Sequence, residues 1–205
     1  MNWVPGEEPP LRKLVYYVAT TLDGFIAGPD GGDPSGASFF PITPDVIDFI
    51  VTHYPETLPG PARTALGIDG PGQSFDTVLE GRGSYEIGLA AGLTDAYPHL
   101  RHLVFSSTLE SEDPDVEIVS KDAIERVRAL KAEAGKDLWL VGGGTLAHSL
   151  LPEIDRLILK QNPSVIGSGI PLFAGAFQAH SFSPIDEITL ESGVRVLTFD
   201  RSENS

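Results

Sequence analysis

Cysteine is absent from this chain of 205 residues, which excludes disulfides, thiolate metal sites and cysteine nucleophiles. No apolar run reaches the about eighteen residues that a membrane-spanning helix needs. A secretory leader is not predicted, because Glu7 and Glu8 stand among prolines where a leader would be basic and then apolar. Basic residues are also few, 14 against 29 acidic ones, and the net charge of −15 argues against nucleic acid or anionic membrane as a partner. We therefore expect a cytoplasmic protein.

The composition, 41% apolar, allows a real hydrophobic core within one domain of ordinary length. We assign residues 12–201 to that domain and residues 1–11, which are polar and proline-rich, to a flexible tail. Apolar β-forming runs alternate with segments of helical periodicity, which predicts an α/β fold with a mainly parallel sheet of about eight strands, flanked by helices. A hairpin around Ser192-Gly193 adds antiparallel strands at one edge. The strands are expected at 14–20, 76–80, 102–106, 116–119, 138–141, 156–160 and within 187–201, and the helices near 44–53, 84–89, 121–134 and 145–151.

Residues 55–73 contain eight Gly or Pro in nineteen positions. This composition predicts a long irregular loop, and loops of such length in compact domains tend to be functional or disordered. We expect this one to shape the mouth of a binding site.

Three glycines, Gly142, Gly143 and Gly144, follow a buried strand and precede a helix. With Ala147 they match the G-x-G-x-x-G/A pattern of dinucleotide-binding turns, in which a pyrophosphate approaches bare backbone at a helix N-terminus. The alternative is that the glycines only permit a tight turn. The position of the motif, two-thirds along the chain, and the lack of any acid in 161–185 argue against an ordinary Rossmann fold.

Two more strand ends carry polar groups. Gly81-Arg82-Gly83-Ser84 offers an arginine and a hydroxyl at a helix start, and Ser106-Ser107-Thr108 offers three hydroxyls. Each alone could be a cap or a turn. Because the carboxyl ends of parallel strands share one sheet edge, the three sites together predict one elongated nucleotide lying across that edge.

Asp23 follows the first strand, in Thr20-Thr21-Leu22-Asp23-Gly24. It could simply cap a turn with its glycine. Alternatively, it is a partly desolvated carboxylate that holds a substrate N–H or transfers a proton, and we assign it as the catalytic residue. His99 and His102 lack a third ligand nearby in the sequence, so no metal site is predicted.

Several segments resemble the dihydrofolate reductase superfamily, specifically the C-terminal reductase domain of the bifunctional riboflavin-biosynthesis deaminase–reductase. The resembling segments occur in the family's order and cover roughly residues 12–200: they are 21–27, 79–86, 104–108, 140–146, 155–159 and 163–173.

The resemblance implies a dihydrofolate reductase-like sheet of eight strands that binds NADPH. It places Gly81, Arg82 and Ser84 at the adenosine-side phosphates, and Ser106 and Ser107 near the 2′-phosphate or adenine ribose. It also implies a pyrophosphate-binding turn with a cis peptide at Gly142–Gly143, nicotinamide contacts, and an acid close to the substrate. The residues in these three roles are, in that order, Gly142, Gly143, Gly144, Thr145 and Leu146; Ala19 and Ile26; and Asp23.

The chain departs from the family in two ways. The family often has Ser-Arg-Thr where this chain has Ser106-Ser107-Thr108, so the missing arginine leaves NADPH over NADH as a preference only. The deaminase half is absent, and a chain without cysteine cannot form its zinc motif. Riboflavin biosynthesis does not follow from the resemblance alone.

The resulting hypothesis is an NADPH-dependent oxidoreductase that transfers a hydride to a C=N or C=O of a small heterocyclic or sugar-like substrate. Tyr17, Phe39 and Phe40 are expected to form an aromatic wall over that substrate, although aromatic residues at such positions often serve the core. The alternative is a non-catalytic protein that binds a dinucleotide or small ligand on the same fold. The C-terminal hairpin could provide the edge of a homodimer.

Overall fold

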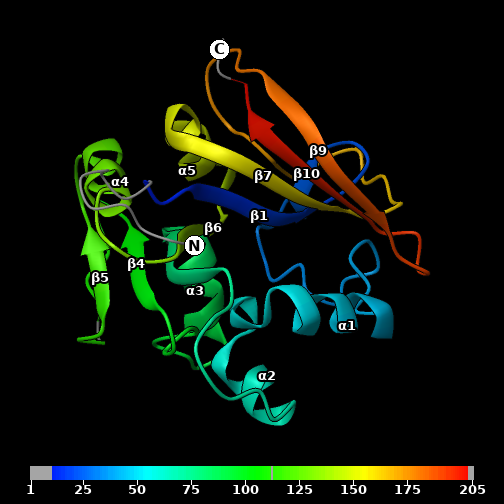
Figure 1. The fold of residues 1–205 in the computed structure, drawn as a ribbon, viewed down its shortest axis with the longest axis horizontal. Helices are drawn as coiled ribbons and strands as arrows, with labels where there is room; N and C mark the ends of the chain where they lie inside the picture. Colours follow the sequence, from blue (N-terminus) through cyan, green and yellow to red (C-terminus); the bar gives the residue numbers. More distant parts are fainter. Residues whose placement is uncertain (1–10, 112, 203–205) are drawn as a thin grey trace, which may run out of the picture.

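A computed structural model describes residues 11–111 and 113–202. Eight strands of these residues form one sheet (Figure 1). The strand order is β5-β4-β3-β6-β1-β7-β10-β9. All pairs from β5 to β7 are parallel, and β10 pairs antiparallel with both β7 and β9. The predicted fold, a mainly parallel eight-stranded sheet with an antiparallel hairpin, is confirmed. The strands are β1 (Leu14–Thr20), β3 (Phe75–Gly81), β4 (Arg101–Phe105), β5 (Val116–Val119), β6 (Asp137–Gly142), β7 (Ile154–Gln161), β9 (Phe182–Thr189) and β10 (Arg195–Arg201).

Helices cover the sheet, and a second small sheet lies beside it. The small sheet pairs β2 (Phe25–Ala27) with β8 (Ile170–Pro171) in antiparallel orientation. The helices are α1 (Pro44–His53), α2 (Gly60–Ala65), α3 (Arg82–Ala90), α4 (Ala123–Lys131) and α5 (Gly144–Ser149), with short 3-10 turns η1 (Pro55–Thr57) and η2 (Leu151–Glu153). None of the helices in the described part of the chain has the length and apolarity to cross a membrane.

The central strand β1 has a nearly continuous apolar sequence because both of its faces are covered. Leu14 and Tyr16 belong to the core that α4 and α5 cover, whereas Val15 and Tyr17 belong to the core that α1 covers. Successive side chains of a strand point to opposite faces, so a strand covered on both faces needs apolar residues at every position. All four of these side chains are buried.

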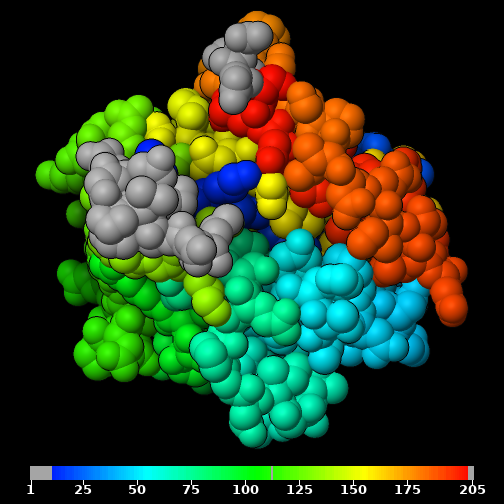
Figure 2. Space-filling model, in the orientation of Figure 1, coloured from blue at the N-terminus to red at the C-terminus, as the bar shows by residue number. Residues whose placement is uncertain are grey.

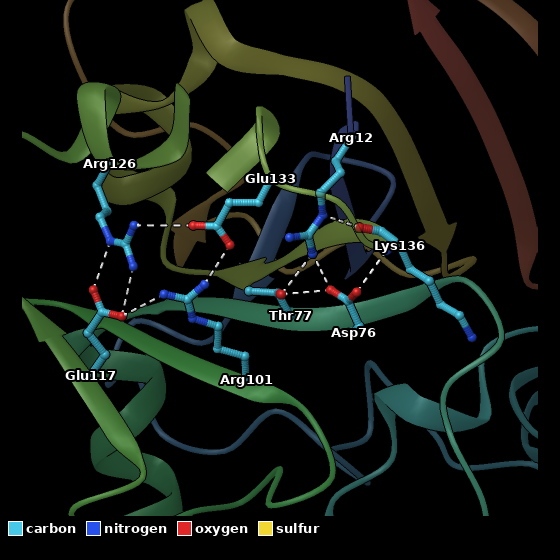
Figure 3. A network of polar contacts seen from close by, with 8 residues as sticks. All are labelled: Arg12, Asp76, Thr77, Arg101, Glu117, Arg126, Glu133 and Lys136. Carbon is cyan, nitrogen blue, oxygen red and sulfur yellow. Dashed lines mark hydrogen bonds and ion pairs between the residues drawn. The ribbon is translucent and has the colours of Figure 1, made fainter. Parts of the chain in front are cut away.

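Ion pairs close the amino-terminal edge of the sheet (Figure 3). Arg126 of α4 donates two hydrogen bonds of 2.8 Å to Glu117 of β5, and Arg101 at the start of β4 contacts both Glu117 and Glu133. Nearby, the buried Arg12 pairs with the carboxylate of Asp76 at the start of β3. The charged side chains named here thus pair with one another at this edge of the sheet.

The hairpin of β9 and β10 turns at 190–194, where the Leu190 amide donates to the Val194 carbonyl at 2.8 Å. Gly193 has a φ of +84°, which favours glycine. The amide of Ser192 donates to Asp45 at 2.7 Å, so this turn lies against the start of α1 (Figure 2). Strand β9 is one edge of the sheet. A dimer through that edge stays a prediction.

Two expectations are wrong, and a third lies almost entirely outside the described residues. The segment 55–73 is not an irregular loop throughout: η1 and α2 form within it, each with a proline in its first turn. The buried guanidinium of Arg63 organises this segment by donating to the carbonyls of Pro55 and Gly70 at 2.9 and 2.8 Å. The Gly142–Gly143 peptide is trans, as are all peptide bonds of the described residues. The expected tail, residues 1–11, falls on residues 1–10, which are not described, and on Leu11, which is exposed and lies outside helix and strand.

Candidate functional site

A cleft of about 710 Å³ opens at the carboxyl ends of β1, β3 and β6. This volume lies within the range of small-molecule sites, and the place is where open α/β sheets bind ligands. Residues 55–73, which were expected at its mouth, contribute nothing to its lining. Eleven predicted site residues line it: Tyr17, Ala19, Ile26, Gly81, Arg82, Ser84, Gly142, Gly143, Gly144, Thr145 and Leu146. Five do not: Asp23, Phe39, Phe40, Ser106 and Ser107.

The three glycines of the turn from β6 into α5 differ in how the structure constrains them. Gly143 has a φ of +93°, so backbone conformation explains it. A Cβ on Gly144 would overlap the carbonyl oxygen of Pro171, so packing explains it. A Cβ on Gly142 would meet only ordinary contacts, Ser84 Oγ at 3.7 Å and Ile26 at 4.0 Å, both in the cleft lining. The contacts of the described residues therefore do not require glycine at 142.

The turn from β3 into α3 presents Arg82 at the same cleft. The arginine side chain is 56% exposed, and its contacts with charged or hydroxyl groups of the described residues are long, 3.6 Å to Glu86 and 3.3 Å to Thr108 Oγ1. Ser84 lies one turn along α3, near Gly142. An arginine held this loosely can turn its planar set of donors toward an anion in the cleft.

Ser106 and Ser107 lie outside the lining, although close to Arg82. The hydroxyl oxygen of Ser106 accepts the amides of Thr108 and Leu109 at 3.3 and 3.1 Å, which is the local turn-capping role of serine. Their predicted contact with a nucleotide phosphate or ribose stays a prediction.

Asp23 is exposed and lies outside the lining as well. Its carboxylate accepts the hydroxyl of Thr21 at 2.6 Å and the amides of Gly167 and Ile166 at 2.7 and 3.2 Å. These hydrogen bonds, that of Thr21 first, lower the pKa of Asp23 below its usual value. Asp23 thereby ties the turn after β1 to the loop that leads into β8. Its catalytic role stays a prediction.

Of the three aromatic residues expected over the substrate, the cleft includes Tyr17 alone. Phe39 and Phe40 pack against each other, with ring centroids 4.8 Å apart, and Phe40 is buried. Their place in the lining is taken by the preceding loop, through Asp33, Pro34 and Ser35.

Lys160 of β7 lines the cleft and was not anticipated from the sequence. Its backbone pairs with Ala19 of β1, and its Nζ lies 4.0 Å from the centre of the Tyr17 ring. Burial lowers the pKa of Lys160 to about 8. The available signal was a lysine that ends the apolar run Leu157-Ile158-Leu159.

A second unanticipated group is Glu80, a buried carboxylate in the lining. Its Oε1 is hydrogen-bonded to Nε2 of His102 at 2.7 Å. His102 is fully buried, and its Nδ1 is hydrogen-bonded to Oδ1 of Asp95, also at 2.7 Å. Burial would lower the pKa of His102, but the hydrogen bonds and charges of Asp95 and Glu80 outweigh it and raise the pKa to about 9. Burial also raises the pKa of Glu80.

The sheet defines an α/β protein with a dihydrofolate reductase-like fold. A candidate riboflavin biosynthesis protein from Shewanella sp. PV-4 has this fold, with a TM-score of 0.69 and 22% identity over 93% of this chain and 99% of its own. So does a diaminohydroxyphosphoribosylaminopyrimidine deaminase/5-amino-6-(5-phosphoribosylamino)uracil reductase from Thermotoga maritima, with a TM-score of 0.63 and 16% identity; the match covers 94% of this chain and 57% of that one.

Sequence comparison identifies the family. The uncharacterized protein YwjB of Bacillus subtilis is 32% identical over 167 residues, which cover 79% of this chain and 83% of YwjB. This chain therefore belongs to the YwjB family. The uncharacterized protein YyaP of the same organism is 27% identical over 198 residues, or 89% of this chain and 92% of YyaP. No family model matches the chain.

Proposed function

We propose that the protein is an NADPH-dependent reductase that delivers a hydride to a C=N or C=O of a small heterocyclic or sugar-like substrate. The observation that carries this proposal is the position of Gly142. Conformation and packing explain its two neighbours, yet glycine at 142 keeps clear a point of the cleft that Ser84 and Ile26 border.

The residues that line the cleft support an elongated dinucleotide as its ligand. Arg82 and Ser84 would hold phosphate at the end of β3, and Gly142 and Gly143 would border the pyrophosphate. Ala19 would border the nicotinamide. Arg82 at the end of β3 and Lys160 on β7 are separated by β6 and β1, and three strand spacings amount to about 14 Å. One cation thus serves each end of the cleft.

When bound, the reduced nicotinamide supplies the hydride. The residues of the chain hold the cofactor and substrate side by side and exclude water, which is the larger part of the protein's contribution to such reactions. Trp139 and Tyr97, both in the lining, add apolar surface near Tyr17.

Binding can be tested without knowing the substrate, because Trp139 is a reporter placed in the cleft. In a Trp3→Phe variant it is the one remaining tryptophan, and bound NADPH is expected to quench its emission and to gain sensitised emission of its own. NADH serves as the comparison for cofactor preference. The absence of saturable quenching by either cofactor at millimolar concentration would refute the proposal.

Turnover is then tested by the absorbance of NADPH with a C=N probe, 2-methyl-1-pyrroline, and a C=O probe, 2,3-butanedione. Consumption of NADPH that depends on enzyme and probe is the expected result. Saturable NADPH binding without consumption across a wider panel of imines and carbonyls would favour the non-catalytic binding protein instead.

A further inference from the structure

Lys160 is the cation of the cleft that cofactor binding does not explain. We propose that Lys160 is the acid of the reaction: its ammonium group protonates the substrate nitrogen or oxygen as the neighbouring carbon receives the hydride. This inference rests on the proposed reductase function and deepens it by assigning the source of the proton.

Lys160 lies next to the expected nicotinamide position. Lys160 pairs with Ala19 across β7 and β1, and paired strands lie about 4.8 Å apart. Ala19, which is expected to border the nicotinamide, is therefore a direct neighbour of Lys160 on one surface of the sheet. A substrate atom in contact with the nicotinamide at this point is within reach of the lysine side chain.

The ammonium group of Lys160 contacts an aromatic ring but no anion among the described residues. It lies over the face of Tyr17, whose ring attracts a cation without neutralising it. Among the described residues, nothing forms a hydrogen bond or an ion pair with Nζ of Lys160. Lys160 is half-buried, so its ammonium group loses part of its hydration without gaining a carboxylate, and a ligand in the cleft could supply the missing partner or accept the proton.

The surrounding groups leave this acid undisturbed. Tyr17 faces it from β1, and the β10 residue paired with it, Val196, carries no charge. Beyond Tyr17 lies Tyr54, whose ring is tilted against that of Tyr17 with the centroids 4.7 Å apart. The buried Glu56 of η1 lies there too, and its Oε1 accepts two backbone amides.

The other charged groups of the cleft are Asp33, Glu80 and Arg82. Glu80 is bonded to His102, and neither carboxylate contributes to the lowered pKa of Lys160, which burial alone accounts for. A lysine with a pKa of about 8 is mostly protonated at neutral pH, yet it releases its proton more readily than an ordinary lysine.

A C–H bond forms as the hydride leaves the reduced nicotinamide, which becomes oxidised. The π electrons of the C=N or C=O bond move to the heteroatom, and that atom forms an N–H or O–H bond with the proton of Lys160. The neutral amine then regains a proton from solvent after product leaves.

Competitive labelling of lysines with acetic anhydride, followed by peptide mass spectrometry across pH, tests the acid without any substrate. Lys160 should label with an apparent pKa of about 8, and Lys121, an exposed lysine in the same chain, is the internal control for the labelling chemistry. Saturating NADPH should slow labelling of Lys160 and leave Lys121 unchanged. A Lys160 that labels with the ordinary lysine pKa of about 10.4, or that NADPH fails to protect, would overturn the assignment.

Kinetics with whichever probe turns over separates an acid from a binding residue. Lys160→Met should lower kcat by about 10²–10⁴-fold and abolish the loss of kcat above pH 8, while Trp139 quenching by NADPH stays within about twofold. Lys160→Arg keeps the charge and should not restore kcat, because guanidinium is a poor acid. A Lys160→Met variant with unchanged kcat, or with KM alone raised, contradicts the proposal. Failure of wild-type protein to bind NADPH would instead refute the reductase function, and the labelling result would distinguish the two.

Discussion

His102 and Glu80 share a buried hydrogen bond of 2.7 Å directly beneath the cleft. The histidine side chain is fully buried, and its other ring nitrogen is bonded to Asp95. Two carboxylates around one imidazole favour the imidazolium form, which is why its pKa rises to about 9 despite burial.

This relationship predicts how stability depends on pH. Because the folded pKa of His102 lies above the unfolded value of 6.5, the folded protein retains a proton that the unfolded chain releases. The stabilisation is complete below pH 6.5 and is lost as pH rises through about 9, and over this window it amounts to about 3 kcal/mol. The raised pKa of Glu80 acts in the same direction.

We expect the free energy of unfolding of wild-type protein, measured by urea denaturation, to fall between pH 6.5 and 9. His102→Gln should be less stable at pH 6 and should show a clearly smaller decline over that window. His53→Gln, which changes an exposed histidine at the end of α1, is the matched control and should keep the wild-type decline. Parallel curves for wild type and His102→Gln would show that the imidazolium is not the stabilised form.

The second prediction concerns Gly142. Gly142→Ala should fold with a Tm close to that of wild type, because the added Cβ meets only ordinary contacts. It should weaken NADPH binding at least tenfold, which corresponds to about 1.4 kcal/mol, because the methyl group occupies the surface that the pyrophosphate would approach. Trp139 quenching measures the affinity.

Two other glycines calibrate this result. Gly88→Ala, in α3 and outside the cleft, should leave NADPH affinity unchanged. Gly144→Ala should instead destabilise the fold, by about 1–3 kcal/mol or more, because its Cβ overlaps the Pro171 carbonyl. Equal NADPH affinity of Gly142→Ala and wild type would remove the main support for the dinucleotide site.

The sequence predicted the sheet well because its strands are buried on both faces. Runs such as 14–19 contain only apolar or aromatic residues, and their burial on both faces of the sheet explains this composition. The rule that parallel strands end at one edge also brought the residues around Gly81 and Gly142 together correctly. These inferences need only local pattern and connectivity.

The sequence could not predict what depends on register and side-chain direction. Lys160 enters the cleft because its strand pairs with β1 so that its side chain lies over Tyr17, and no local pattern encodes that pairing. Ser106 and Asp23 show the converse: both are polar residues after strands, but their oxygens are bonded to nearby backbone amides. Short polar side chains satisfy such amides at turns, and sequence alone does not separate this role from ligand binding.

The guanidinium of Arg82 makes long contacts with Glu86 and Thr108 in the part of the chain that the structure describes. Arg82→Ala should weaken NADPH binding by about 10–100-fold, because a hydrogen bond to a charged group contributes about 1.5–3 kcal/mol. The dependence of affinity on salt should also become weaker. Tm should change little, since an exposed arginine with such contacts adds little stability.

Arg195→Ala is the control for the loss of one positive charge. Arg195 is exposed and pairs with Glu187 across the hairpin, away from the cleft. Its removal should leave NADPH affinity unchanged at moderate salt. An equal loss in both variants would indicate a general effect of net charge on this acidic protein rather than a contact at Arg82.

The last prediction concerns Asp23. Its hydrogen bonds to Thr21, Ile166 and Gly167 depend on the carboxylate, so Asp23→Asn should lower Tm at neutral pH by removing a charged acceptor. The folded pKa of Asp23 is lowered, so its stabilisation is present above the unfolded value and is lost as pH falls below about 4. The Tm difference between wild type and Asp23→Asn should therefore shrink in acid.

Kinetics of the same variant distinguishes a catalytic Asp23 from one that positions the loop before β8. A catalytic carboxylate predicts a fall in kcat that persists at temperatures well below the Tm of the variant, with NADPH affinity nearly intact. Asp30→Asn, an exposed acid in the next loop whose carboxylate accepts the Gly32 amide at 3.3 Å, is the control and should change neither kcat nor affinity. Loss of kcat and NADPH affinity in equal measure would instead mean that Asp23 acts through the fold of the cleft, because displacement of 166–170 would disturb cofactor and substrate together.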